Sequence, residues 1–433
     1  MPDLSKETEL QHQPVATEDE KSIPAEAGPT ELSSTQKRWR PWQAVGACLI
    51  YFNSWGLTMS LGVYQAFYTT TLIPHESQAR IGWISAMAFA MSFFGAVIAG
   101  PLVDAGHLKP VLTAGVVLTC FGLMMTSLCQ HEYYQLLLAQ GVVMGFGCGL
   151  LLLPSMSIPV VWFPTPKGMA IVFTLTGVAT SIGGIIYSAM FHYIEHDSGW
   201  RWAVRATGFV SLGTSTAGAM MLQYKEAPAQ RRKFFNLSMW NEPGFKGVLL
   251  AAFFAWGWAF TPINWLEGYY LHEQRIRHSD VQFWLVPIAF AGGIPGRIVL
   301  NGLAVKFGGF NTWALTVAAC GILNFCWMAV HTQAAVIAFA FFYGFVVLGF
   351  SAVTTLAIMS LAPDRIDVGT RLSMAMLAAG LGLLAGFPLA GQILWSTESF
   401  TGMQAFTGAI MLLTFAIAMC VRHVHAGFTL KVI

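Results

Sequence analysis

Residues 134–158 read YQLLLAQGVVMGFGCGLLLLPSMSI, a stretch in which no residue carries a charge. A helix rises about 1.5 Å per residue, so about 20 such residues cross the roughly 30 Å hydrocarbon core of a bilayer. A helix on the surface of a soluble protein needs apolar residues on one face only. The stretch therefore predicts a membrane-spanning helix.

Apolar runs of similar length recur along the whole chain. We predict twelve spans, near 44–67, 81–103, 110–129, 134–158, 168–192, 201–223, 247–269, 281–304, 310–330, 334–359, 370–394 and 401–421. They are continuous runs, unlike the alternating segments of about ten residues in membrane β-barrels. Because backbone groups in lipid must be satisfied within their own segment, we expect an all-α membrane protein with twelve transmembrane helices.

The composition agrees with a lipid environment. Hydrophobic residues make up 55% of the chain and charged residues 10%, whereas a soluble domain has about 25% charged residues. The net charge of +2 gives no reason to expect a nucleic-acid partner. The seven cysteines form no C-x-x-C pair and have no metal-type spacing. We expect a bilayer as partner and predict no catalytic residue, no metal and no cofactor.

The basic residues orient the spans, because cytoplasmic loops of membrane proteins carry an excess of lysine and arginine. With a cytoplasmic N-terminus, the inner side receives all ten lysines together with Arg38, Arg40, Arg231, Arg232, Arg365, Arg371 and Arg422. The outer side keeps Arg80, Arg201, Arg275 and Arg277. We therefore expect both termini in the cytoplasm, with the protein in the plasma membrane or, as the alternative, the vacuolar membrane.

The spans divide six and six around a basic connection. The predicted parts are a disordered cytoplasmic tail (1–42), a six-helix half (43–224), a cytoplasmic loop (225–246), a second six-helix half (247–422) and a short cytoplasmic tail (423–433). An offset of about two hundred residues relates features of the halves, such as Gly141 and Gly145, which match Gly344 and Gly349. Parallel six-helix repeats imply a site between the halves near the midplane.

Several short motifs carry a more specific resemblance. They are Phe52-Asn-Ser-Trp-Gly56, Lys167-Gly-Met-Ala170, Ser181-Ile-Gly-Gly-Ile-Ile-Tyr187, Gly199-Trp-Arg-Trp-Ala203 and Gly386-Phe-Pro-Leu-Ala-Gly391. In these motifs and their order the chain resembles the major facilitator superfamily, and within it the fungal branch similar to monocarboxylate transporters. The likeness covers essentially all of residues 42–422. It implies a secondary transporter that works by alternating access, and we expect a monomer.

The chain also departs from the patterns of that family. Asp104 and Lys109 remain in the loop after the second span, but Ala105 stands where an arginine is expected. Val305 replaces the acidic residue of the second half. These departures weaken the expectation of ordinary gating salt bridges, although Asp104 and Lys109 stay candidates for gating or coupling.

Arg297 is the first candidate for binding substrate. The resemblance to animal monocarboxylate transporters implies a lysine and an aspartate near Val63 and Gly293, and only the arginine of that set is present. A lone ion at membrane depth costs several kcal/mol unless it is paired or hydrated. A guanidinium can hold a carboxylate through two hydrogen bonds. The alternatives are an arginine that bonds backbone carbonyls freed near Pro295 and a gate residue near the cytoplasmic face.

The other charged candidates lie at the ends of spans. Arg371 opens the eleventh span, for which the resemblance implies a gate or helix-start role. Glu267 is the one acid within the seventh apolar run, so it could carry a proton. Its place near the end of that run favours a solvated helix end instead. Proton coupling therefore remains a hypothesis.

Neutral polar side chains within the spans complete the predicted substrate site. They are Asn53, Tyr64, Tyr187, Asn264 and Tyr343. Each could bind a solute, but an amide could equally bond a neighbouring helix, and tyrosines near helix ends often belong to the aromatic belt of the interface.

Transport of a small organic solute, either a monocarboxylate or another acidic compound, is the function that these patterns favour. The alternative within transport is an efflux pump for a larger secondary metabolite made by neighbouring biosynthetic enzymes. The alternative of another class is a non-transporting nutrient sensor. An enzyme is not expected, because no nucleophile–base pair, metal cluster or cofactor loop lies within the spans.

Overall fold

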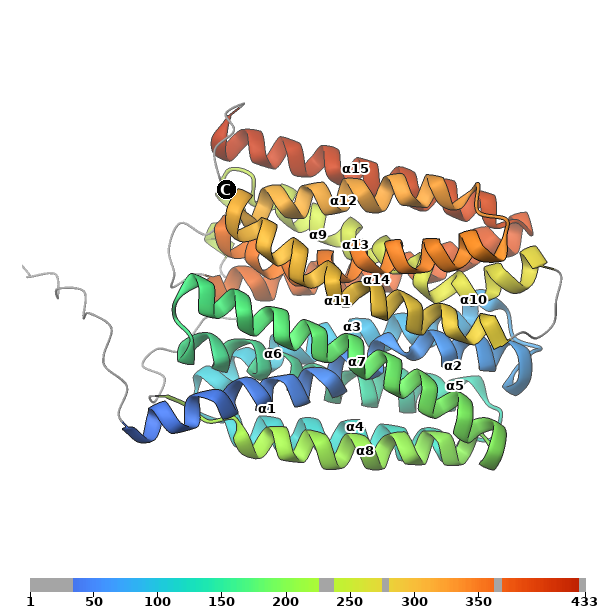
Figure 1. The fold of residues 1–433 in the computed structure, drawn as a ribbon, viewed down its shortest axis with the longest axis horizontal. Helices are drawn as coiled ribbons and strands as arrows, with labels where there is room; N and C mark the ends of the chain where they lie inside the picture. Colours follow the sequence, from blue (N-terminus) through green and yellow to red (C-terminus); the bar gives the residue numbers. More distant parts are fainter. Residues whose placement is uncertain (1–33, 226–236, 275–279, 362–367, 428–433) are drawn as a thin grey trace, which may run out of the picture. The chain divides into compact units, whose positions relative to one another are not determined.

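The computed structural model describes residues 34–225, 237–274, 280–361 and 368–427. Residues 40–433 form one compact unit, and all contacts reported below lie within it. The predictions for residues 1–33 and for Arg231, Arg232, Arg275, Arg277 and Arg365 fall outside the described residues. Within the unit, long helices run side by side, with α3 to α8 on one side and α9 to α15 on the other (Figure 1).

The first six predicted spans are all helical. Their helices are α1 (Ser34–Met59), α2 (Leu61–Phe67), the π-helix η1 (Tyr68–Leu72), α3 (Gln78–Asp104), α4 (Leu108–Leu128), α5 (Tyr133–Leu136), the π-helix η2 (Leu137–Met144), α6 (Gly145–Trp162), α7 (Pro166–Ser198) and α8 (Trp200–Met221). Three consecutive pieces form the first span, and three form the fourth.

The last six predicted spans are helical as well. A short 3-10 helix, η3 (Leu237–Asn241), precedes α9 (Phe245–Ala259), α10 (Thr261–Gln274), α11 (Asp280–Phe307), α12 (Gly309–Trp327), α13 (Gln333–Ser360), α14 (Val368–Thr397) and α15 (Phe400–Ala426). Helices α9 and α10 together form the seventh span. The all-α prediction with helices at all twelve segments is confirmed.

Eleven of these helical segments in the described ranges are long and apolar enough to cross a bilayer. The exception is α8, which has 22 residues and so sufficient length. It carries Arg201 and Arg205 and several hydroxyl side chains, which lower its hydropathy. Some of those hydroxyls are used inside the bundle, since Thr214 bonds Asn53 of α1. The sixth span is therefore a polar helix that is accommodated by its neighbours.

One boundary prediction is wrong. Residues 34–42, assigned from the sequence to a disordered tail, already belong to α1. Adding a residue to an existing helix is far easier than nucleating one, so an apolar helix extends readily into a polar flank. The end of α15 also extends the last span to Ala426.

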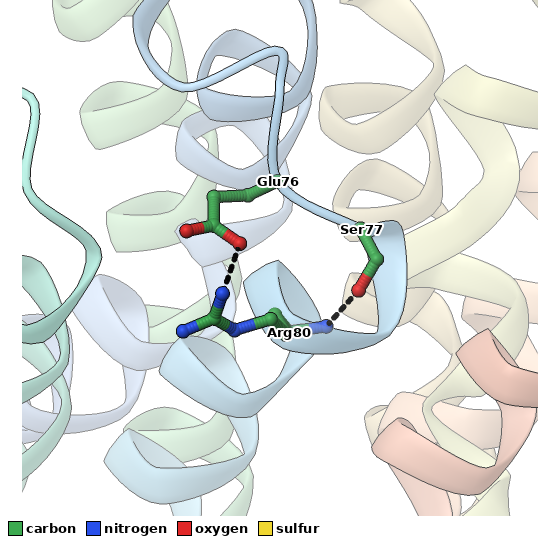
Figure 2. A network of polar contacts seen from close by, with 3 residues as sticks. All are labelled: Glu76, Ser77 and Arg80. Carbon is green, nitrogen blue, oxygen red and sulfur yellow. Dashed lines mark hydrogen bonds and ion pairs between the residues drawn. The ribbon is translucent and has the colours of Figure 1, made fainter.

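The start of α3 shows how a helix begins beside a charged loop (Figure 2). Ser77 caps the helix, because its hydroxyl accepts a hydrogen bond from the backbone N–H of Arg80 at 3.3 Å. The Arg80 guanidinium donates to Glu76 at 2.6 Å and lies over the ring of Tyr133. Arg80 is thus satisfied locally, at the end of the bundle opposite to the C-terminal end of α15 (Figure 1).

Close contacts between helices repeat with the offset seen in the sequence. A side chain at Gly145 of α6 would overlap the backbone of Ala88 in α3, and one at Gly344 of α13 would overlap Ala289 in α11. Likewise, α1 and α7 meet through Gly56 and Gly183, and α9 and α14 through Gly257 and Gly386. Small residues let helix backbones approach closely in the absence of a hydrophobic driving force between helices.

Two spans are broken at corresponding places. The first changes from α1 to α2 at Ser60, and the seventh changes from α9 to α10 at Phe260, 200 positions later. Interrupted helices at matching positions of two repeats commonly mark a binding site. The two breaks therefore indicate that a binding site lies beside them, between the two groups of spans.

The glycine contact between α9 and α14 can be tested directly. Gly386→Ala should lower the free energy of unfolding by about 1–3 kcal/mol, because its methyl group would overlap the backbone of Gly257. Gly302→Ala is the matched control, since nothing lies within 4 Å of the added methyl, and it should be neutral or stabilising by up to about 1 kcal/mol. Thermal unfolding of the purified variants in detergent measures both. Equal midpoints for the two would contradict the packing described.

Candidate functional site

A cavity of about 70 Å³ lies at the centre of the described helices. We call it the inner cavity. It is lined by Tyr51, Trp55, Phe93, Leu152, Met156, Phe173, Thr176, Gly177, Thr180, Ala252, Trp256, Arg297, Ser351, Ala352, Thr354, Thr355, Ile358, Leu372, Ala375, Met376 and Ala379. These residues come from α1, α3, α6, α7, α9, α11, α13 and α14, so both groups of six spans contribute to its wall.

Arg297 is the one charged side chain among the residues that line the inner cavity. It is 3% exposed, and its guanidinium donates to the Ser181 hydroxyl on α7. Its Nε is buried and has no hydrogen-bond partner within the described part of the chain. The aliphatic part of the side chain packs on Gly177, where any side chain would overlap it. The guanidinium therefore lies in the cavity wall without a carboxylate to balance its charge there.

Asn301 extends this contact by one turn of α11. Its amide donates to the Thr174 hydroxyl of α7 at 3.0 Å. The side-chain carbonyl oxygen of Asn301 is buried, and none of the described residues forms a hydrogen bond with it. Arg297 and Asn301 thus make two polar bridges from α11 to α7, which belong to different groups of six spans.

Aromatic rings close the inner cavity at one end. Trp55 and Trp256 stack with ring centroids 5.7 Å apart, and Phe93 lies edge-on to both, at 5.5 and 5.1 Å. The contacts continue through Phe89 to Phe260 and Phe387. We call these six rings the aromatic layer. Trp55 and Trp256 are 201 positions apart and precede the two helix breaks, so equivalent positions of the repeat supply the central pair.

A second cavity, of about 510 Å³, lies beyond the aromatic layer, and we call it the outer cavity. It is lined by Gln65, Ala66, Thr69, Thr70, Gln78, Asn264, Trp265, Glu267, Gly268, Leu271, His272, Gln282, Leu394, Trp395, Glu398 and Phe400. In the first and seventh spans these residues follow the helix break, whereas inner-cavity residues precede it. The two cavities share no lining residue.

Glu267 lies in this outer cavity, and one expectation about it is wrong. It is not a solvated helix end, because it is 5% exposed in the middle of α10. Gln282 of α11 lines the same cavity, and Oε1 of the Glu267 carboxyl group has no partner among the described residues. Asn264 lines the same cavity, and its amide donates to the Phe260 carbonyl at 3.2 Å.

Asn53 and Tyr187 are brought together, but away from both cavities. The Tyr187 hydroxyl donates to the amide oxygen of Asn53. Thr214 of α8 donates to the same oxygen at 3.0 Å, and the Asn53 amide nitrogen donates to Leu49 at 2.6 Å. All the hydrogen-bonding groups of this amide are thus used in joining α1, α7 and α8.

The other two predicted tyrosines are likewise buried between helices. The Tyr64 hydroxyl lies 3.5 Å from the Thr207 hydroxyl of α8. The Tyr343 hydroxyl donates to the Ala259 carbonyl at 2.7 Å, at the end of α9, and accepts from Asn324 at 3.2 Å. Neither tyrosine lines the inner cavity or the outer cavity. Of the six predicted substrate-binding residues, Arg297 alone lies on the inner cavity.

Two of the charged residues predicted as gates, Lys109 and Asp104, have neighbours within the first six spans. Lys109, at the start of α4, donates to the Ala219 and Met220 carbonyls at 2.7 and 3.1 Å. A cation there satisfies free carbonyls and interacts well with the negative end of α8. Asp104 ends α3 close to Tyr224, and the two side chains interact electrostatically.

Arg371 has a definite partner that the sequence did not indicate. It is 4% exposed at the start of α14 and forms an ion pair with Glu242, between η3 and α9. Its guanidinium also lies 5.2 Å from the centre of the Phe245 ring. The ion pair joins α14 to the segment between η3 and α9, which is the last part of the connection between the two groups of spans.

Sequence reasoning missed Trp55, Trp256, Ser181 and Asn301. A usable signal existed for the two tryptophans, since the offset of about two hundred residues relates them directly. No comparable signal marked Ser181 or Asn301, because a single hydroxyl or amide in an apolar run has many possible partners.

The bond from Tyr187 to Asn53 gives a test of a structural role. Tyr187→Phe should lower the free energy of unfolding by about 1–2 kcal/mol, since a buried amide oxygen loses a donor. Tyr193→Phe, at an exposed site on the same helix, should change it by less than about 0.5 kcal/mol. Thermal unfolding and the KM for transport are measured together. A raised KM at unchanged stability would instead assign Tyr187 to substrate binding.

The Arg371–Glu242 pair is tested by a double-mutant cycle. Arg371→Gln and Glu242→Gln should each destabilise the protein, because each leaves a partly buried partner unpaired. The double variant should be about 1 kcal/mol more stable than the sum of the single effects indicates. Thermal unfolding at low ionic strength supplies the four values. Strictly additive effects would rule out the pair as a contributor to stability.

Comparison with known proteins identifies the family to which the chain belongs. Residues 43–366 match the model of the Major Facilitator Superfamily. The chain is 31% identical to the MFS-type transporter dbaD of Emericella nidulans, over 85% of this chain and 82% of that protein. It is 32% identical to the aspyridones efflux protein apdF of the same organism, over 86% and 76%. It is 26% identical to the fujikurins efflux protein of Gibberella fujikuroi, over 89% and 83%.

A solved structure shares the fold. The crystal structure of a mutant of the nucleoside transporter NupG aligns with a TM-score of 0.66 at 13% identity, covering 90% of this chain and all of that one. These relatives are fungal transporters, two of them named as efflux proteins, and their names do not single out a monocarboxylate branch. The chain is a multi-pass membrane transporter of small organic solutes that belongs to the major facilitator superfamily.

Proposed function

We propose that this transporter exports an acidic secondary metabolite with a large apolar part, and that Arg297 binds its anionic group. The observation that carries the proposal is the guanidinium of Arg297, which lies in the wall of the inner cavity with no carboxylate among the lining residues. A buried charge requires a partner or water. An anionic substrate supplies the missing charge, and its oxygen atoms suit the planar fork of a guanidinium.

The rest of the inner cavity favours an apolar body over a small acid. Rings and methionines such as Trp55, Trp256, Phe173 and Met156 form much of its wall, and threonine hydroxyls lie among them. Rigid aromatic faces bind flat or ring-shaped solutes. The same arginine would also bind a small monocarboxylate, as the sequence resemblance implies, but such a solute would leave most of these apolar surfaces without a partner.

Relatives support export. Two of the similar fungal proteins are named as efflux proteins, for aspyridones and fujikurins. Their identities of 32% and 26% extend over most of this chain, so a shared direction of transport is a reasonable extension. The chemical class proposed here comes from the inner cavity itself and not from those names.

Alternating access would proceed between the six-helix halves, residues 43–224 and 247–422. The inner cavity of about 70 Å³ is smaller than the roughly 300–1,000 Å³ of sites for drug-sized ligands. Entry therefore requires the helices around it to part, and the aromatic layer must separate for release into the outer cavity. We propose that the termini face the cytoplasm, that the plasma membrane holds the protein, and that it works as a monomer.

The anion-binding role is tested with cells that overproduce the transporter. Profiling of metabolites inside and outside the cells, with and without the gene, identifies the exported compound. Arg297→Gln should reduce its export about tenfold or more, the loss expected for one hydrogen-bonded charge. Arg297→Lys should restore it in part, because the charge returns without the planar fork.

Arg205→Gln is the matched control. Arg205 lies on α8, donates to Ser127 at 3.2 Å and lines neither cavity, so export should be unchanged. Amounts in the membrane and thermal unfolding are compared for all variants. Export by Arg297→Gln at the wild-type rate would refute the anion-binding role, and an exported compound without an acidic group would refute the substrate class.

A further inference from the structure

The aromatic layer is built around one pair of rings that comes from both groups of spans. Trp55 of α1 and Trp256 of α9 stack with their ring centroids 5.7 Å apart and their planes inclined by 28°. Both side chains are buried, and both line the inner cavity. A third ring does not fit between them, because two stacked contacts of about 3.5 Å each require about 7 Å. The pair is therefore closed to a solute in the inner cavity.

The other rings of the layer support this pair from the side away from the inner cavity. Phe260 stacks on Trp256 at 5.5 Å, and Phe89 lies 6.0 Å from Trp55. Phe89, Phe260 and Phe387 line neither the inner nor the outer cavity. A solute in the inner cavity therefore meets the layer at the two tryptophans and at Phe93, which are the layer residues that line that cavity.

Parting the two tryptophans costs the free energy of their contact. On the proposed route a solute leaves the inner cavity through the layer, so the stack of Trp55 on Trp256 has to open. A saturated body that passes between them replaces the lost contact by apolar burial alone. A flat aromatic ring makes two ring contacts in place of the one that was broken, and aromatic pairs are stabilised beyond their buried area. An aromatic solute therefore lowers the free energy of the parted layer.

We propose that the aromatic layer selects substrates that carry a flat aromatic ring, and that this ring inserts between Trp55 and Trp256 on its way to the outer cavity. Arg297 then binds the anionic group, while the two tryptophans determine which apolar body passes. The ring gains its second contact only when the layer has parted, so the selectivity affects the maximal rate of transport more than KM. The inference rests on the proposed function and narrows its substrate class to aromatic acids.

Two acids of similar size test this selectivity. Hydrocinnamate and its ring-saturated analogue cyclohexanepropionate share the same chain and carboxylate, and they differ in whether the ring is flat and aromatic. Uptake is measured in inside-out vesicles at a pH at which both acids are ionised, and uptake by vesicles without the transporter is subtracted. Hydrocinnamate should have a maximal rate about three- to tenfold higher, which corresponds to one additional aromatic pair, whereas the two KM values should differ less.

Substitutions in the pair should remove the preference. Trp256→Leu, and Trp55→Leu at the equivalent position of the repeat, should bring the two maximal rates within about twofold, because an inserted ring loses one aromatic partner. Trp256→Phe should keep most of the preference, since a ring remains. Trp258→Leu is the matched control on the same helix. Trp258 is buried against Phe254 and Phe406 and lines neither cavity, so the preference should be unchanged. Thermal unfolding confirms that each variant is folded.

Several outcomes would overturn the inference. They are equal maximal rates for the two acids, a full preference in both leucine variants of the pair, loss of the preference in Trp258→Leu, and an exported metabolite that has no flat ring. Arg297→Gln should slow both acids alike and leave their ratio unchanged. If Arg297→Gln slows uptake but no ring preference exists, this inference fails and the proposed function stands. Uptake of neither acid, or no effect of Arg297→Gln, contradicts the proposed function itself.

Discussion

The guanidinium of Arg297 lies buried between α11 and α7, where Ser181 is its hydrogen-bond partner and Gly177 leaves room for its methylene groups. A charge at this depth costs free energy unless something compensates it. The bundle supplies hydroxyl groups and space, but no lining carboxylate. That imbalance is the reason why we propose an anionic substrate for the inner cavity. The two groups of spans touch through polar side chains at this point.

The two-hundred-residue repeat explains why the inner and outer cavities lie on opposite sides of the aromatic layer. Corresponding breaks at Ser60 and Phe260 interrupt the first and seventh spans, and the tryptophans just before them, Trp55 and Trp256, stack on each other. Helices that continue unbroken through the bilayer satisfy their backbone groups but cannot easily bend. The breaks allow the ends of two spans to move separately, and the aromatic layer between them divides an inner cavity with a cation from an outer cavity with a carboxyl group.

The polar residues that looked most promising in the sequence divide into two kinds. Asn53, Tyr187 and Tyr343 bond to neighbouring helices and so hold the bundle together. Arg297 and Glu267 lie on cavities, and each has a buried atom that bonds no other residue in the described ranges. Both kinds read alike in the sequence, because each is a polar side chain in an apolar run. The number of satisfied hydrogen bonds separates them, and only the packed structure provides that information.

The sequence by itself determined that this chain crosses the membrane as twelve helices, since lipid requires long apolar helices and allows few charges. It also revealed the two-hundred-residue repeat and singled out Arg297, because a charge at membrane depth is rare enough to be informative. Tertiary structure decided which side chains share a cavity, that Arg371 pairs with Glu242, and that Glu267 is buried. These three features depend on how helices far apart in the chain are rotated and how closely they approach one another. The hydropathy of a single segment does not specify either quantity.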